Sequence, residues 1–190
     1  MPGPVITVGG PHGTGKSTYA RALAEALELR YVCAGELFRE LAKEKKMSLE
    51  DFNALAAEDP TIDRIIDERT KTEAKQGGVV VDAQLAAWMV KDLATLKLLL
   101  TAPDNVRFKR IADRDRTTLA VARKETLTRE SIQRHRYNEY YGINTDDLTI
   151  YDLKIDTSLY PKEKTKHVVI DSVRKALDGI NEGKPGHQIG

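Results

Sequence analysis

Apolar residues along this chain form short, β-rich runs, and these runs alternate with longer stretches in which apolar positions recur at helical spacing. Continuous runs such as VVV and LKLLL are typical of strands covered on both faces of a parallel sheet. The pattern predicts five strands, at Val5–Val8, Arg30–Cys33, Val79–Val81, Leu96–Thr101 and Leu153–Ile155. It predicts helices over residues 16–28, 35–46, 48–57, 61–76, 84–91, 104–114, 118–141 and 162–178. We therefore predict an α/β fold, in which helices flank a five-stranded parallel sheet and right-handed crossovers join the strands.

Breaks in this pattern are few. Pro60 separates the two helices around it, because proline disfavours helical backbone at the preceding residue, Asp59. The length of 190 residues fits one domain, and no repeat or interdomain linker divides it. We predict a single domain over residues 1–178, followed by a flexible tail over residues 179–190, where Gly, Pro and polar residues dominate.

Net charge and cysteine content exclude several kinds of partner and site. The formal net charge is +1, so the chain has no overall basic field that would attract nucleic acid or acidic lipid. Cys33 is the only cysteine, which excludes an intrachain disulfide and a multi-cysteine metal site and fits a reducing compartment. We see neither a membrane-spanning segment nor a signal peptide. The expectation is a cytoplasmic protein that acts on small molecules, with no nucleic-acid, membrane or protein partner evident.

One motif carries specific chemistry. Residues 10–17 read GPHGTGKS and fit G-x-x-x-x-G-K-[ST], the phosphate-binding loop, between a predicted strand and a predicted helix. Its glycines let backbone N–H groups surround a triphosphate, and the helix that begins at Lys16 directs its positive end at the same phosphates. Lys16 would bind the β- and γ-phosphates, and Ser17 would ligate Mg²⁺. The predicted ATP-binding residues here are Gly10, Pro11, His12, Gly13, Thr14, Gly15, Lys16, Ser17 and Thr18.

Two candidate residues, His12 and Asp82, also have simpler structural interpretations. His12 has the simpler interpretation of a variable loop position. Asp82 ends the VVVD strand at the edge where ligands bind in open parallel sheets, so we predict that Asp82 and Ser17 hold the metal. The alternative for Asp82 is a surface aspartate that caps the next helix.

A group of arginines follows the fourth predicted strand. Its members are Arg107, Arg110, Arg114, Arg116, Arg123, Arg129, Arg134 and Arg136. Arg110 and Arg114 share one helix face, and so do Arg129 and Arg136. The polar segment between them, about residues 113–128, would suit a movable lid that closes over phosphates. Because acidic residues alternate with the arginines, a solvated charged helix is the alternative.

Longer stretches resemble a known family. They are CAGELFRELAKEKKMSLEDF, AEDPTIDRIIDER, LAAWMVK, APDNVRFKRIADRD and RYNEYYGINTDDLTIYDLKIDTS. With them the chain resembles the small P-loop nucleoside monophosphate kinases, and among these the archaeal type of cytidylate kinase, over roughly residues 4–160. The phosphate-binding loop alone indicates only an NTPase, whereas the segments around AGELFR and YGINTDDL are much more specific.

The resemblance implies a P-loop fold that transfers the γ-phosphoryl group of ATP to CMP or dCMP with Mg²⁺ as cofactor. It implies acceptor-binding helices at about residues 35–76 and places the segment 156–158 by the donor base. The residues implied as catalytic are Lys16, Arg114, Arg129 and Arg136, and Arg110 joins the ATP-binding set. The acceptor-binding set is Gly35, Arg39, Gln84 and Arg136. For Arg39 an ion pair with Glu36 is the alternative.

Three departures from the family pattern lie on the acceptor side. Cys33 stands where relatives usually have serine, Ala83-Gln84 replaces Gly-Arg, and Gln133 stands where relatives often have an acid near the acceptor sugar. These leave open UMP, AMP or a small non-nucleotide as acceptor. An ATP-hydrolysing switch or assembly factor is the alternative from another class.

Overall fold

Five parallel strands build the centre of the molecule. The computed structural model describes residues 2–182, with the side chains at positions 50, 53, 54 and 57 left aside. The strands are β1 (Val5–Gly9), β2 (Arg30–Cys33), β3 (Val79–Asp82), β4 (Leu96–Thr101) and β5 (Leu153–Asp156). They pair in the order β2-β3-β1-β4-β5, all in parallel. The predicted fold class is confirmed.

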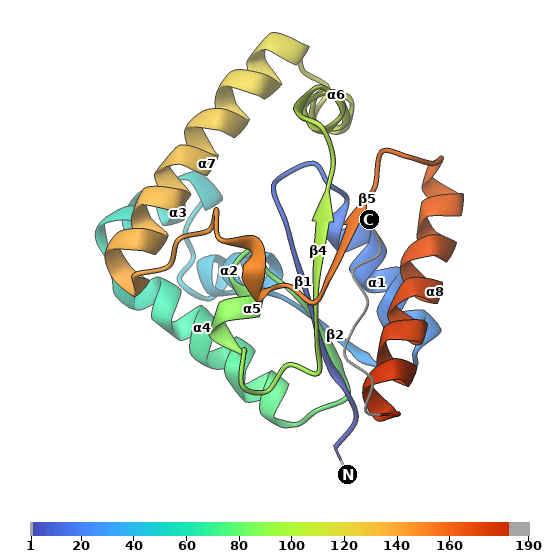
Figure 1. Cartoon of the computed structure of the whole chain (residues 1–190). Coiled ribbons are helices and arrows are strands. Elements are labelled where there is room, and N and C mark those ends of the chain that lie inside the picture. Colours follow the sequence, from blue (N-terminus) through green and yellow to red (C-terminus); the bar gives the residue numbers. More distant parts are fainter. Residues whose placement is uncertain (1, 183–190) are drawn as a thin grey trace.

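Eight α-helices surround the sheet in the described part of the chain (Figure 1). They are α1 (Lys16–Ala26), α2 (Ala34–Glu44), α3 (Leu49–Glu58), α4 (Pro60–Lys75), α5 (Ala86–Met89), α6 (Asp104–Asp115), α7 (Leu119–Tyr141) and α8 (Lys162–Asn181). A short 3₁₀ turn, η1 (Leu148–Ile150), precedes β5. The helices α1 and α8 cover one face of the sheet, while α4 and α5 lie on the other.

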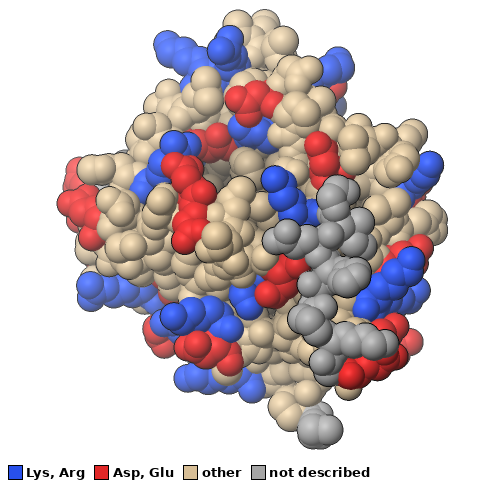
Figure 2. Space-filling model, viewed as in Figure 1, with Lys and Arg blue, Asp and Glu red and all other residues tan. Residues whose placement is uncertain are grey.

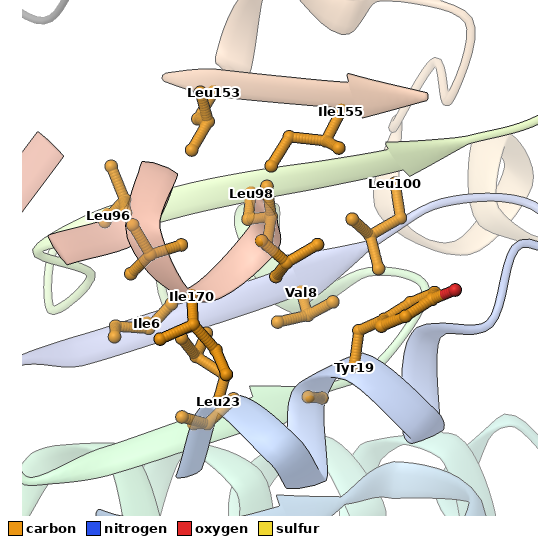
Figure 3. Packing of buried hydrophobic residues seen from close by; sticks show 14 of the residues in the cluster. Ile6, Val8, Tyr19, Leu23, Leu96, Leu98, Leu100, Leu153, Ile155 and Ile170 are labelled. Carbon is orange, nitrogen blue, oxygen red and sulfur yellow. The ribbon is translucent and has the colours of Figure 1, made fainter. Parts of the chain in front are cut away.

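The main core lies between the sheet and the pair α1 and α8 (Figure 3). Its strand residues, such as Val8 and Leu98, are fully buried because helices cover both faces of these strands. Leu23 of α1 and Ile170 of α8 close this layer from the helix side. The continuous apolar runs that predicted the strands therefore have their physical cause in two-sided burial.

A separate apolar cluster joins α2, α3 and α4, with Phe52 fully buried at its centre and Phe38 packed against it at 4.7 Å between ring centroids. Asp59 and Pro60 set the boundary between α3 and α4. The Asp59 carboxylate accepts a hydrogen bond from the Thr61 backbone N–H at 2.9 Å, and Pro60 begins the helix. The break predicted at Pro60 is confirmed.

The arginine-rich region forms two helices with a tight turn between them. Arg116 ends α6 with a left-handed backbone (φ 53°), and Thr118 caps α7 by accepting from the Val121 N–H at 3.3 Å. Only residues 116–118 of the predicted lid segment lie outside helices. From this turn α7 runs back toward α3 and α4 (Figure 1).

Two predicted boundaries are wrong. The helix expected over 84–91 is reduced to the single turn α5, because the backbone leaves helical geometry at Leu85 and Val90, of which Leu85 is buried beside the cavity and Val90 packs in the cluster against the sheet. At the other end, α8 continues to Asn181, so residues 179–181 belong to a helix and not to a flexible tail. The remaining predicted tail, 183–190, lies outside the described residues.

Charges of both signs are intermixed on the face shown in Figure 2. Within residues 2–182, no helix has the length and apolarity needed to cross a bilayer.

Burial in the central strands predicts a large cost for truncation. We expect Leu98→Ala to lower the free energy of unfolding by about 2–5 kcal/mol, because it removes buried methyl groups and leaves a cavity. Leu159, which is 68% exposed, is the matched control, and Leu159→Ala should change stability by about 0.5 kcal/mol or less. Denaturant unfolding of both variants checks this, and equal losses would contradict the assigned core.

Candidate active site

One cavity of about 930 Å³ opens at the carboxyl ends of the strands. It is walled by the loop after β1, by α2 and α4, by α6 and α7, and by residues 160–162. The predicted site residues that line it are His12, Gly13, Gly15, Lys16, Ser17, Thr18, Gly35, Arg39, Asp82, Gln84, Arg110, Arg114, Arg129 and Arg136. The structure thus brings together residues that are far apart in the sequence.

Three predicted loop residues do not line the cavity but shape its floor. Gly10 has φ +134°, and a Cβ there would lie 2.1 Å from the Leu100 carbonyl oxygen, so only glycine fits. Thr14 is buried and donates its hydroxyl to the Pro11 carbonyl at 2.9 Å. These contacts hold the loop against the sheet.

Lys16 lies at the start of α1, directly after Gly15, whose left-handed backbone (φ 86°) turns the chain into the helix. Its Nζ donates to the Pro11 carbonyl at 3.0 Å, so the ammonium folds back over its own loop. Burial lowers the pKa of Lys16, and the nearby carboxylates of Asp82 and Glu130 oppose that shift. A cationic amine therefore sits in a partly desolvated position beside the loop amides, where an anionic ligand would add to its stability.

The loop is tied to the arginine-rich helices by Arg107 and Glu130. The Arg107 side chain of α6 is 5% exposed and donates to the His12 carbonyl at 2.7 Å, to Glu130 at 2.8 Å and to Asp104 at 2.6 Å. Glu130 of α7 also accepts from the His12 backbone N–H at 3.0 Å. A buried cation is thus paired on all sides, and it fixes α6, α7 and the loop relative to one another.

The His12 side chain also contacts α7. Its Nε2 lies 2.9 Å from the Gln133 amide oxygen, which can only accept, so the ring donates from this nitrogen. Burial lowers the pKa of His12 to about 4, and the charge of Lys16 adds to this shift. The imidazole is therefore neutral near pH 7. Residues of α7 thus hold both the backbone and the side chain of His12, and Gln133 contacts the phosphate-binding loop through this ring.

Asp82 ends β3 between the ends of β1 and β2, opposite Val8 and Cys33 in the sheet register. It is 2% exposed, and one of its oxygens accepts from the Tyr31 hydroxyl at 2.8 Å. The alternative that Asp82 caps the next helix is wrong, because Leu85 precedes α5. Asp82 and Ser17 both line the cavity and offer oxygen ligands, which suit Mg²⁺. Across residues 2–182, no cluster of three or more His, Cys, Asp or Glu forms a protein-only metal site.

Arg110 lies where α6 meets the end of β5. Its guanidinium donates to the Thr157 carbonyl at 2.7 Å and to the Thr157 hydroxyl at 2.9 Å. That hydroxyl in turn donates to the Thr14 carbonyl at 2.9 Å. Arg110 therefore borders both the phosphate-binding loop and the segment 156–158.

Arg114 and Arg129 line the same cavity from α6 and α7. The Arg114 guanidinium makes two bonds to the neighbouring Asp115, at 2.7 and 2.8 Å. Arg129 makes no ion pair within 4 Å among the described residues, although its charge acts on His12 and Asp115. The Arg129 guanidinium is thus available to a ligand as it stands. The Arg114 guanidinium would first have to break its hydrogen bonds to the exposed Asp115 carboxylate.

Arg136 lies seven residues after Arg129, which is about 10 Å further along α7. It pairs with Asp63 of α4, with 3.2 Å between Nε and Oδ2, and both side chains are largely buried. Next to this pair, the Tyr141 hydroxyl donates to Asp67 of α4 at 2.6 Å. Neither aspartate was among the residues predicted from the sequence, although AEDPTIDRIIDER places them at i, i+4 on one helix face.

The remaining predicted acceptor residues lie in the first turns of α2 and directly after β3. The Arg39 guanidinium is 3.9 Å from the Glu36 carboxylate, and Arg39 also lines the cavity. The ion pair with Glu36 and the location in the cavity are therefore compatible. Gln84 accepts weakly from the Tyr137 hydroxyl at 3.5 Å. Cys33 lines the cavity as well, and burial raises the pKa of its thiol, which is therefore protonated near pH 7.

Comparisons with solved structures agree with the fold. Shikimate kinase from Bacteroides thetaiotaomicron has a TM-score of 0.64 at 13% identity and covers 92% of this chain and 98% of its own. A gluconokinase from Sinorhizobium meliloti has a TM-score of 0.59 at 16% identity, with 96% and 97% coverage. Both are similar to this chain in fold alone.

Sequence comparisons are more specific. The cytidylate kinase of Staphylothermus marinus is 47% identical over 173 residues, which is 91% of this chain and 98% of the relative. That of Methanocaldococcus jannaschii is 44% identical over 177 residues, with 90% and 99% coverage. The model of the cytidylate kinase-like family matches residues 5–159, from β1 through the segment beside Arg110. With its phosphate-binding loop, its arginines and the helices α2, α3 and α4 inside that match, the chain belongs to the cytidylate kinase-like family.

Proposed function

We propose that this protein is a cytidylate kinase, which transfers the γ-phosphoryl group of ATP to CMP or dCMP and yields ADP and CDP or dCDP. The observation that carries the proposal is the single cavity in which the phosphate-binding loop faces the arginines of α6 and α7 and the acids of α4. Cytidylate kinases 44–47% identical over most of the chain support this acceptor. No observation favours the switch or the non-nucleotide acceptor.

On the donor side, the loop amides and Lys16 would bind the β- and γ-phosphates. Arg110, which borders the loop and Thr157, would contact the donor near its base. Ser17 and Asp82 would hold Mg²⁺, which supplies charge neutralisation at the phosphate oxygens when bound. The supporting observation is the buried Asp82 carboxylate, which lines the cavity beside Ser17 with one oxygen held by Tyr31.

On the acceptor side, the cavity walls formed by α2 and α4 would hold the monophosphate, with Arg39 on its phosphate. Arg129 would act on the group in transfer, since it lines the cavity with no partner within 4 Å among the described residues. Catalysis would then consist of positioning and charge stabilisation, because the acceptor phosphate is already an anionic nucleophile. A general base is not required, and His12, neutral near pH 7, would position the loop.

An acceptor panel tests the proposed function. With ATP and Mg²⁺, we expect one CDP formed for each ADP, and a kcat/KM for CMP at least about tenfold above those for UMP and AMP. Chromatographic separation of the nucleotide products measures this. Preference for AMP would overturn the acceptor, and free phosphate equal to ADP without any CDP would indicate hydrolysis.

Removal of the loop ammonium tests the donor site. We expect Lys16→Met to lower kcat by about 10²–10³-fold, because the charge that stabilises the transferred group is lost. Lys109→Met is the matched control, since Lys109 lies on α6 with its side chain 74% exposed and outside the cavity lining. Steady-state assays and thermal melts of both variants separate catalysis from folding, and a fully active Lys16→Met variant would refute the assignment.

A further inference from the structure

The end of the cavity between α4 and the last turns of α7 has its own polar chemistry. Asp63 and Asp67 face it from α4, with the apolar Ile66 between them, and Arg136 and Tyr141 face it from α7. On α7, Arg136 and Tyr141 lie about 9 Å and about 16 Å beyond Glu130, which contacts the phosphate-binding loop. This end is therefore separate from the phosphate-binding loop, as the base of an acceptor nucleotide must be.

The hydrogen bonds here are incomplete. Oδ2 of Asp63 and Nε of Arg136 are buried, and neither makes a hydrogen bond, although the two charges lie 3.2 Å apart. Asp67 is oriented by the Tyr141 hydroxyl through Oδ2 alone. Burial raises the pKa of both aspartates, which shows that their charge is poorly solvated. Buried polar groups in this condition are stabilised by a ligand that supplies the missing partners.

Pyrimidine bases differ in the group that they would offer. Cytosine carries a 4-amino donor, for which a carboxylate is the matching acceptor. Uracil carries an oxygen acceptor at the same position, which a carboxylate repels because both groups are acceptors. An arginine beside the carboxylate can donate to the remaining ring acceptors of cytosine. The aspartates and Arg136 therefore match the polarity of cytosine and oppose that of uracil.

We propose that Asp67, oriented by Tyr141, accepts a hydrogen bond from the 4-amino group of the acceptor base, and that this contact selects cytosine over uracil. Arg136, paired with Asp63, supplies donors to the same ring. This inference rests on the proposed function and names the residue that sets its specificity. It assigns Asp67 a role in discrimination rather than in the phosphoryl transfer itself.

The test compares three acceptors at saturating ATP and Mg²⁺: CMP, UMP and the 5′-monophosphate of pyrimidin-2-one riboside, which lacks only the 4-amino group. For the wild-type protein, loss of that group should lower kcat/KM by at least about tenfold. For Asp67→Asn, the kcat/KM ratio of CMP to UMP should fall by about tenfold to a hundredfold, because an amide can also donate to the uracil oxygen. The pyrimidin-2-one penalty should largely disappear in the same variant.

Two further variants separate discrimination from structure. Tyr141→Phe should shift the ratio in the same direction by a smaller factor, since it only releases Asp67. Glu68→Gln, on the neighbouring exposed turn of α4, should leave all three values unchanged. Equal losses for every acceptor in Asp67→Asn would give Asp67 a structural role and overturn the inference.

The wild-type measurements stand without any variant. If the wild-type protein phosphorylates the pyrimidin-2-one nucleotide as well as CMP, the assignment of Asp67 is wrong even if the Asp67→Asn protein does not fold. If the wild-type protein phosphorylates none of the three acceptors, the proposed function itself fails. The two failures are therefore distinguishable.

Discussion

The buried guanidinium of Arg107 is the contact on which the geometry of the cavity depends. It binds Asp104 on its own helix, Glu130 on α7 and the carbonyl of His12 in the phosphate-binding loop. A buried cation is tolerated only when its donors are paired, and removing one partner leaves a charge in a low-dielectric site. Arg107 therefore does more than add stability, because its three partners can be satisfied together only when loop, α6 and α7 are in register.

The same contact explains why α7 can be long and mostly exposed. Only Ala122, Thr126 and Tyr137 of its described side chains are buried, so apolar packing along its length is sparse. Its position is set by polar contacts at separate points: Glu130 at the loop, and Arg136 and Tyr141 at α4. These contacts hold the arginine-bearing face of the helix toward the cavity.

Local features of the sequence were sufficient for the fold and for the loop. The strands could be predicted because burial on both faces requires continuous apolar runs in the sequence. The loop could be predicted because its Gly, Lys and Ser residues have a fixed spacing. The error at α5 has a physical cause as well. Apolar spacing predicted the length of an amphipathic helix, but the burial of Leu85 and Val90 limits it to one turn.

The contacts that α7 makes around the cavity were harder to predict, because they join residues that are far apart in the sequence. Asp67 and Tyr141 are 74 residues apart, and His12 and Gln133 are 121 apart. No periodicity links such pairs, and each residue alone resembles a solvated surface group. The resemblance aligned Gln133 with an acid that relatives often have near the acceptor sugar, and it gave no sign that in this chain the neutral amide pairs with the neutral ring of His12.

This pairing bears on how the two ends of the cavity work together. Gln133 lies between Arg129, which would stabilise the transferred phosphoryl group, and Arg136, which would donate to the base, so both arginines belong to the same helix. A carboxylate at position 133 would place a further negative charge against His12, whereas with the amide the carboxylates that act on Lys16 are those of Asp82 and Glu130. The departure from the family pattern at Gln133 therefore bears on the phosphate-binding loop, which its amide contacts through His12.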